Sequence, residues 1–180
     1  ERRTQKELYD EIESLGVYNN AFTRTDCTTY MILSHRDNFE QALDIQSDML
    51  LHSTIPPGKV DKEKGIVVNE LKSDGMGFRM MGPDPSEHDA ALFEGTPYAM
   101  DVIGSVDSVT SIARDRIYEY YTTWYRPGNM TALVMGDFDR DSIVALYERY
   151  FGAAEGGAGA QAHVGPILEE GRVLVHKSRE

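Results

Sequence analysis

Cysteine is almost absent from this chain, because Cys27 is the only one among its 180 residues. A single thiol cannot form an internal disulfide, and it gives no zinc-ribbon spacing. Basic residues are also few, with 18 Lys and Arg against 30 Asp and Glu and a formal net charge of -12. This balance argues strongly against a nucleic-acid partner, which requires clustered basic side chains. No apolar run approaches transmembrane length, so no membrane span is expected.

The length and composition suit one domain, since 41% of the residues are hydrophobic and can form a proper core. The acidic balance is compatible with basic peptide substrates, although solubility explains it equally well. Gly and Ala dominate Ala153 to Ala162, which predicts a linker. We therefore expect a domain over residues 1–152 and, over 153–180, the linker and the start of a next domain. The chain opens at Glu1 without Met, so we expect a piece of something longer.

Helical and strand patterns alternate along the chain. Helices are predicted over 4–15, 38–52, 61–74, 84–93, 114–124 and 140–151, and strands over about 19–23, 27–34, 130–135 and 172–176. Gly16 is predicted to end the first helix, and Asp139 to cap the last one. Taken alone, this order gives a protein of strands and helices with a helix-rich middle.

The helix predicted over 61–74 carries two carboxylates of interest. Its apolar residues recur at helical spacing and predict a single buried face. They are Val60, Ile66, Val67 and Leu71. Glu63 and Glu70 lie seven residues apart and point roughly the same way, with about 10 Å of helical rise between them. Only one of them could bind a given metal ion directly, at about 2.0–2.2 Å. The alternative is a solvated acidic face, since such pairs are common.

The histidines give no metal site by spacing. Four of them have no second His or Cys at ligand spacing, which favours surface or capping roles. They are His35, His52, His163 and His176. The segment Asp84-Pro85-Ser86-Glu87-His88 is one substitution away from H-x-x-E-H, in which two His bind zinc and the Glu is the general base. Because Asp84 stands at the first position and Pro85 in the first turn, we interpret Asp84 as a helix N-cap.

Four blocks together resemble the insulin-degrading enzyme, pitrilysin and mitochondrial processing peptidase family of inverted zinc peptidases. They are Glu11-Ile12-Glu13-Ser14-Leu15-Gly16; Asn20-Ala21-Phe22-Thr23 followed by Thr28 and Tyr30; Glu63-x-x-x-Val67-x-x-Glu70-Leu71; and Tyr125-Arg126-Pro127-x-Asn129-Met130 leading into Val134-x-Gly136-Asp137. The resemblance covers about residues 4 to 152, with the blocks in the order of the family. It implies an α/β two-layer sandwich, a mixed and mainly antiparallel sheet with helices packed on one face, incomplete at its N-terminal side.

The resemblance also implies roles for particular residues. In that family zinc is held by the two His of H-x-x-E-H and by a Glu of a later helix, which corresponds to Glu70. Glu63 corresponds to a supporting acidic residue of the catalytic site. The segment Asn20 to Thr23 corresponds to an exposed edge strand that pairs with the substrate backbone. An edge strand offers free N–H and C=O groups to an extended peptide. The alternative for this segment is an ordinary hairpin arm packed in a sheet.

This sequence departs from the family pattern in one respect: it contains no H-x-x-E-H. In the family that motif lies shortly before a segment like Glu1 to Thr4, so the sequence is expected to start just after it. One carboxylate cannot assemble a tetrahedral zinc site. We therefore expect this chain alone to bind zinc weakly if at all, and not to hydrolyse peptides.

Two functions follow from the resemblance. In the first, the chain is a fragment of a zinc-dependent endopeptidase whose Zn²⁺ activates a water for attack on an extended peptide. In the second, it belongs to a non-catalytic partner or scaffold subunit of the same family. The residues that precede Glu1 in the parent gene separate the two, through an intact or a degenerate H-x-x-E-H. Expected partners are a peptide or unfolded protein substrate and a homologous second domain or subunit. A third reading is an acidic binding module unrelated to this family.

Overall fold

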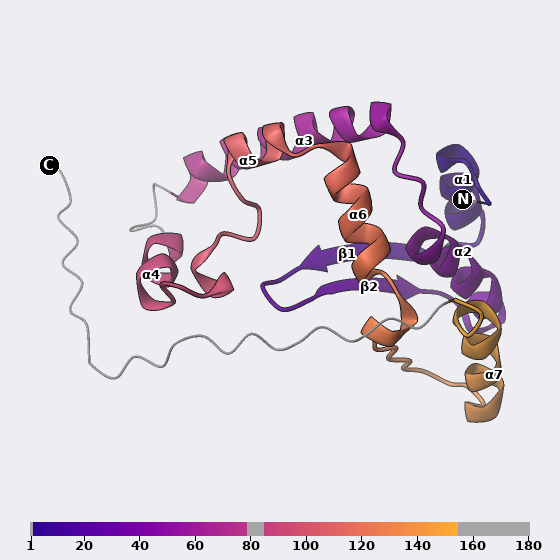
Figure 1. Cartoon of the computed structure of the whole chain (residues 1–180). Coiled ribbons are helices and arrows are strands. Elements are labelled where there is room, and N and C mark those ends of the chain that lie inside the picture. The colour runs from indigo at the N-terminus through magenta and orange to yellow at the C-terminus, as the bar shows by residue number, and fades with distance from the viewer. Residues whose placement is uncertain (1, 79–84, 155–180) are drawn as a thin grey trace, which may run out of the picture. The chain divides into compact units, whose positions relative to one another are not determined.

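A computed structural model describes residues 2–78 and 85–154 (Figure 1). The chain divides into two compact units, Glu1–Val60 with Ile112–Ala160, and Asp61–Ser111 with Gln161–Glu180. The first unit contains α1 (Gln5–Ser14), β1 (Tyr18–Thr23), β2 (Thr28–Leu33), η1 (Arg36–Asn38), α2 (Phe39–Leu51), α6 (Arg114–Trp124), η3 (Pro127–Asn129) and α7 (Arg140–Phe151). The predicted strand over 172–176 lies outside the described residues. The predicted domain boundary at residue 152 stays a prediction.

Local signals at both ends define α1. Thr4 is its N-cap: its hydroxyl accepts a hydrogen bond from the Glu7 N–H, and the Glu7 carboxylate accepts one from the Thr4 N–H at 2.8 Å. This reciprocal pair is a capping box. At the other end Gly16 has φ +61°, a left-handed conformation that strains residues with a Cβ. Gly16 therefore ends the helix as predicted, and β1 begins two residues later.

The two predicted strands form an antiparallel hairpin. β1 pairs with β2 in a register that sets Tyr18 opposite Leu33 and Thr23 opposite Thr28. At the turn the Arg24 N–H donates to the Cys27 carbonyl at 2.8 Å. Within the described residues, these two strands make up the whole sheet.

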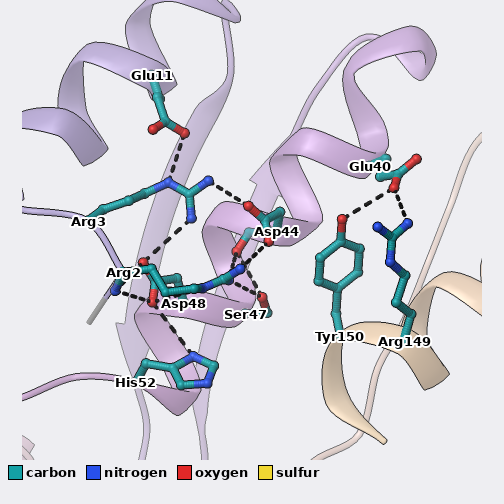
Figure 2. Close-up of polar contacts among 10 residues, drawn as sticks. All are labelled: Arg2, Arg3, Glu11, Glu40, Asp44, Ser47, Asp48, His52, Arg149 and Tyr150. Atoms are coloured by element: carbon teal, nitrogen blue, oxygen red, sulfur yellow. Dashed lines mark hydrogen bonds and ion pairs between the residues drawn. The ribbon is translucent and has the colours of Figure 1, made fainter. Parts of the chain in front are cut away.

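Helix α2 forms the core of the first unit. Ala42, Leu43 and Ile45 are fully buried on it, and α2 packs against α1 and α7. One face of the hairpin also rests on α2, because Asn19 of β1 donates to the Met49 sulfur and Gln46 donates to the Tyr30 carbonyl of β2. In the first turn of α2, Glu40 forms an ion pair with Arg149 of α7 (Figure 2).

The N-terminal segment is tied to α2 by an ionic cluster, Arg2, Arg3, Asp44 and Asp48, drawn in Figure 2. Arg3 donates to Asp44 at 2.5 Å and to Glu11 of α1 at 2.8 Å, and Arg2 donates to Asp44 at 2.8 Å. The Asp48 carboxylate, 2% exposed, accepts from the Arg2 backbone N–H at 3.1 Å. Partial burial opposes a charged Arg3, yet its hydrogen bonds to Asp44 and Glu11 keep its pKa above the ordinary value.

Helices α6 and α7 have the predicted bounds, but the strand predicted between them is wrong. Residues 130–135 form no strand, and Leu133 and Met135 are 81% and 85% exposed. A strand requires a partner for its backbone groups, and no strand of the described residues pairs with this segment. The predicted cap of α7 is confirmed, because the Asp139 carboxylate accepts from the Ser142 N–H at 2.9 Å.

The second unit is helical in its described residues. Helix α3 (Pro57–Phe78) begins at the end of the first unit and continues through the second. It is followed by α4 (Pro85–Leu92), η2 (Pro97–Ala99) and α5 (Val106–Ser111). The helix predicted over 61–74 is confirmed, because it lies within α3. The prediction of a single buried apolar face on it is wrong, because Ile66 is 50% exposed. Within the unit no other described helix packs extensively along this stretch, and burial needs such a neighbour.

Candidate functional site

The outer edge of β1 offers backbone groups that the hairpin does not use. In an antiparallel pair, residues that exchange hydrogen bonds with the partner strand alternate with residues that do not. Because Arg24 bonds to Cys27 at the turn, the even-numbered residues of β1 face β2. Asn19, Ala21 and Thr23 then turn their N–H and C=O groups outward. Within the described residues β1 pairs with no strand other than β2, so no described strand uses this outer edge.

One outward group on this edge has a partner within its own strand. The Ala21 N–H donates to the Asn20 side-chain oxygen Oδ1 at 2.8 Å. The Asn20 amide nitrogen Nδ2 in turn donates to the Tyr18 hydroxyl at 2.8 Å. The substrate-binding segment predicted from the sequence includes Asn20 and Ala21 but not Tyr18 or Asn19. The signal that could have found them is the hairpin register, which puts alternate residues on the same face and alternate backbone groups at the same edge.

The opposite strand is held from the helical side. The Tyr30 carbonyl turns away from β1 and accepts from Gln46 of α2, and the Tyr30 hydroxyl meets that of Tyr125 at 2.5 Å. Burial, followed by the hydrogen bond to Tyr125, raises the pKa of Tyr30 above its ordinary value, so the phenol stays neutral. These contacts fix β2 on the unit, and β1 is held by its pairing with β2 and by the contact of Asn19 with Met49 of α2.

The hairpin face that points away from α2 is exposed and partly apolar. Tyr18 and Phe22 of β1 are 53% and 41% exposed, and Leu33 of β2 is 70% exposed. Arg24 lies over the Phe22 ring, 5.4 Å from its centroid. Alternation of side chains along the strands places all of them on the face opposite Asn19 and Tyr30.

The acidic pair lies on α3, in the other unit of the chain. Glu63 and Glu70 are both exposed, and seven residues of continuous helix separate them. The structure therefore keeps them on one helix, as predicted. It assigns them and β1 to different units.

The described residues do not fit a zinc ion. No group of three or more His, Cys, Asp or Glu side chains among them is close enough to hold a metal. Glu63 and Glu70 are about 10 Å apart along the helix axis, which exceeds the span of one coordination sphere. Of this pair, only one carboxylate could therefore contact a given ion, where a tetrahedral site needs several ligands.

The two histidines whose side chains the structure describes, His35 and His52, form no metal-binding group with this pair. His52 ends α2 and lies 3.6 Å from the buried Asp48 carboxylate, and His35 lies 3.4 Å from Asp37. His163 and His176 are outside the described residues, as is Asp84, and His88 falls within α4. Of the surface or capping roles predicted for His35, the structure shows capping, because its ring accepts from the Asp37 N–H at the start of η1.

Two sequence models of one peptidase family match most of the chain. The model described as insulinase (peptidase family M16) matches residues 1–74, and the model described as the M16 inactive domain matches residues 111–180. The first match contains β1 and the Glu63/Glu70 pair. This chain belongs to the M16 family of peptidases, as the four sequence blocks predicted.

Curated relatives agree with this assignment. The chain is 30% identical over 156 residues to the mitochondrial-processing peptidase subunit beta of Caenorhabditis elegans, covering 87% of this chain and 34% of the relative. It is 29% identical over 154 residues to an uncharacterized zinc protease of Mycobacterium leprae, covering 84% of this chain and 34% of the relative. The chain thus spans about a third of the length of these relatives.

The fold is also that of solved peptidases. The crystal structure of the periplasmic protease PqqL from Escherichia coli matches with a TM-score of 0.75 and 25% identity, covering 89% of this chain and 18% of that chain. The predicted fold class is confirmed by this likeness.

None of the described helices is long and apolar enough to cross a membrane.

Proposed function

We propose that this chain is part of a zinc-dependent M16 endopeptidase and that its β1 edge binds extended peptides by strand addition. The observation that carries the proposal is the outer edge of β1, where Asn19, Ala21 and Thr23 direct backbone groups away from β2. An incoming peptide backbone can pair with these groups as a third strand. Main-chain hydrogen bonds require an extended shape and few particular side chains, which suits a peptide or an unfolded protein segment.

The acidic pair on α3 supplies the second part of the proposal. We assign Glu70 as the one metal ligand of this chain and Glu63 as a supporting acidic residue of the catalytic site, as the family resemblance implies. The family assignment and the zinc protease among the relatives support zinc as the metal. Because the 180 residues contain no H-x-x-E-H to supply the other zinc ligands and the general base, we expect that the chain alone does not hydrolyse peptides. The relative named as a subunit supports a homologous second domain or subunit as partner.

A peptide-methylation experiment tests the strand addition. We would titrate the isotope-labelled chain with an extended, uncharged peptide and follow backbone amide resonances. The amides of Asn19, Ala21 and Thr23 should shift more than those of Thr29 and Met31, which face β1. Methylation of the peptide amides that face β1 removes the donors and adds bulk, so affinity should fall about tenfold or more.

The matched control is the same peptide methylated on the intervening amides, which would face solvent. It should bind like the unmethylated peptide. Equal binding of both methylated peptides, or shifts concentrated on β2, would contradict pairing at the β1 edge. Neither peptide requires a change in the protein, so a folding defect cannot explain the result.

A non-catalytic partner or scaffold subunit is the alternative. The observation that favours it is the match of residues 111–180 to the inactive domain of the family. Such a subunit would bind peptides at β1 without contributing to cleavage. An H-x-x-E-H encoded directly upstream of Glu1 favours the peptidase, and a degenerate motif there favours the scaffold.

A further inference from the structure

The side chain of Asn20 occupies part of the proposed peptide-binding edge. Its Oδ1 accepts from the Ala21 N–H at 2.8 Å, and that N–H is one of the groups directed away from β2. Its Nδ2 donates to the Tyr18 hydroxyl at 2.8 Å, which fixes the plane of the carboxamide. Asn20 and Tyr18 lie two residues apart and therefore on the same face of β1. The strand thus satisfies its own edge amide.

This bond has to break before a peptide can pair at Ala21. A strand added to β1 needs the Ala21 N–H as a donor for one of its carbonyls, and the two hydrogen bonds in an ordinary geometry exclude each other. Both Asn20 and Ala21 are exposed, so the internal bond competes with water and its net strength is modest. A peptide that offers only one carbonyl gains little free energy by replacing the hydrogen bond between Asn20 and Ala21. A strand that also bonds to Asn19 and Thr23 in the same event replaces it readily.

We propose that Asn20 is a displaceable cap on the β1 edge, oriented by Tyr18, which lowers the affinity for peptides and favours extended segments long enough to make the neighbouring bonds. The inference rests on the proposed strand addition at β1. It makes Asn20 a positioning residue of the edge with an inhibitory effect on binding.

Three variants of the 180-residue chain test the cap. Asn20→Ala frees the Ala21 amide, so the uncharged extended peptide should bind about two- to tenfold more tightly than to wild type. Tyr18→Phe keeps the cap and removes its anchor, so binding should tighten by less. Asn20→Asp retains the acceptor with a charge, which strengthens the hydrogen bond to Ala21 and should weaken peptide binding. High salt in all titrations removes general charge effects.

Amide hydrogen exchange tests the same cap without any peptide. In wild type the Ala21 amide should exchange more slowly than the Thr23 amide, which also faces outward. Asn20→Ala should remove that difference, and Asn20→Asp should enlarge it. Thr28→Ala is the matched control, because it removes the exposed contact of the Thr28 and Thr23 hydroxyls on the same hairpin and leaves the Ala21 amide untouched. It should leave Ala21 exchange as in wild type.

The outcomes separate the cap from the proposed function. Unchanged Ala21 exchange in Asn20→Ala overturns the cap. Weaker or unchanged peptide binding by that variant also overturns it, since Asn20 would then help to hold the peptide or play no part. If neither wild type nor any variant binds the peptide, the strand addition itself fails, and with it the regulatory role. Faster exchange in that case would still show that Asn20 protects the edge amide.

Discussion

Substitution of Asp48 tests whether the ionic cluster at the N-terminus stabilises the first unit. The Asp48 carboxylate is 2% exposed and accepts a hydrogen bond from the Arg2 backbone N–H. It also forms ion pairs with the guanidinium groups of Arg2 and Arg3, each at 3.5 Å. His52 lies 3.6 Å from the same carboxylate. Asp48→Asn keeps the shape, removes the charge and turns an amide donor toward other donors.

The geometry sets the expected magnitude. Loss of one partner from a buried ion pair typically costs about 3–5 kcal/mol. Here the Arg2 side chain is 47% exposed, and its Nε lies 3.5 Å from the carboxylate, so water recovers part of that loss. We therefore expect Asp48→Asn to lower the free energy of unfolding by about 2 kcal/mol. Asp10→Asn breaks only the exposed pair with Lys6 and should cost about 0.3–0.5 kcal/mol.

Urea unfolding followed by far-UV circular dichroism measures both variants. The difference between them should exceed 1 kcal/mol, with unchanged dependence of the free energy on urea concentration. If Asp48→Asn and Asp10→Asn cost the same, the cluster does not stabilise the unit. A changed slope would point to an altered unfolded state, and Asp48→Ala would then be compared at the same temperature.

Burial opposes a charged Asp44, but hydrogen bonds from Arg3 and Arg2 outweigh it and hold the pKa of this carboxyl below its ordinary value. Its contribution to stability is therefore present above the unfolded-state pKa of about 3.9 and is lost as pH falls through the lower folded-state pKa. Urea midpoints measured from pH 5 downward should fall less steeply for Asp44→Asn than for wild type. Removal of the α7 cap by Asp139→Ala should lower the urea midpoint in the same assay, because the Ser142 N–H loses its acceptor. Asp141→Ala, in the same turn, serves as the control, and an equal shift of the midpoint in both variants would contradict the cap. Isothermal titration should show only weak zinc binding, equal in wild type and Glu70→Gln, whereas micromolar or tighter binding that depends on Glu70 would contradict a single-ligand chain.

Features that depend on neighbours in the sequence were predictable. Gly16 ends α1 and Asp139 caps α7 because each acts on backbone groups within a few residues. The hairpin follows from β-forming residues on both sides of a short turn. The helices, likewise, are set by periodicity and local caps.

Features that depend on partners distant in the sequence were not predictable from it. The segment 130–135 has a strand composition, but composition does not supply the partner strand. Ile66 has helical spacing with other apolar residues, yet half of its surface is exposed because no described helix of its unit packs extensively along α3. The cluster of Arg2 with Asp44 and Asp48 joins residues more than forty positions apart, which no local pattern indicates.

The candidate site was predictable in part for the same reason. The sequence blocks point to residues 20–23 as an edge strand, but which backbone groups face outward depends on the register with β2. That register selects Asn19, Ala21 and Thr23 and leaves Asn20 to act through its side chain. Side-chain direction of this kind follows from the folded hairpin and not from residue type.

The same register bears on which peptides the proposed edge would prefer. An added strand extends both faces of the hairpin, and alternate residues of that strand would lie beside Tyr18 and Phe22 on the face opposite α2. Cross-strand aromatic and β-branched pairs contribute about 0.2–1 kcal/mol each. Backbone hydrogen bonds would then give affinity for any extended peptide, whereas these two aromatic side chains would favour peptides with apolar residues at every second position.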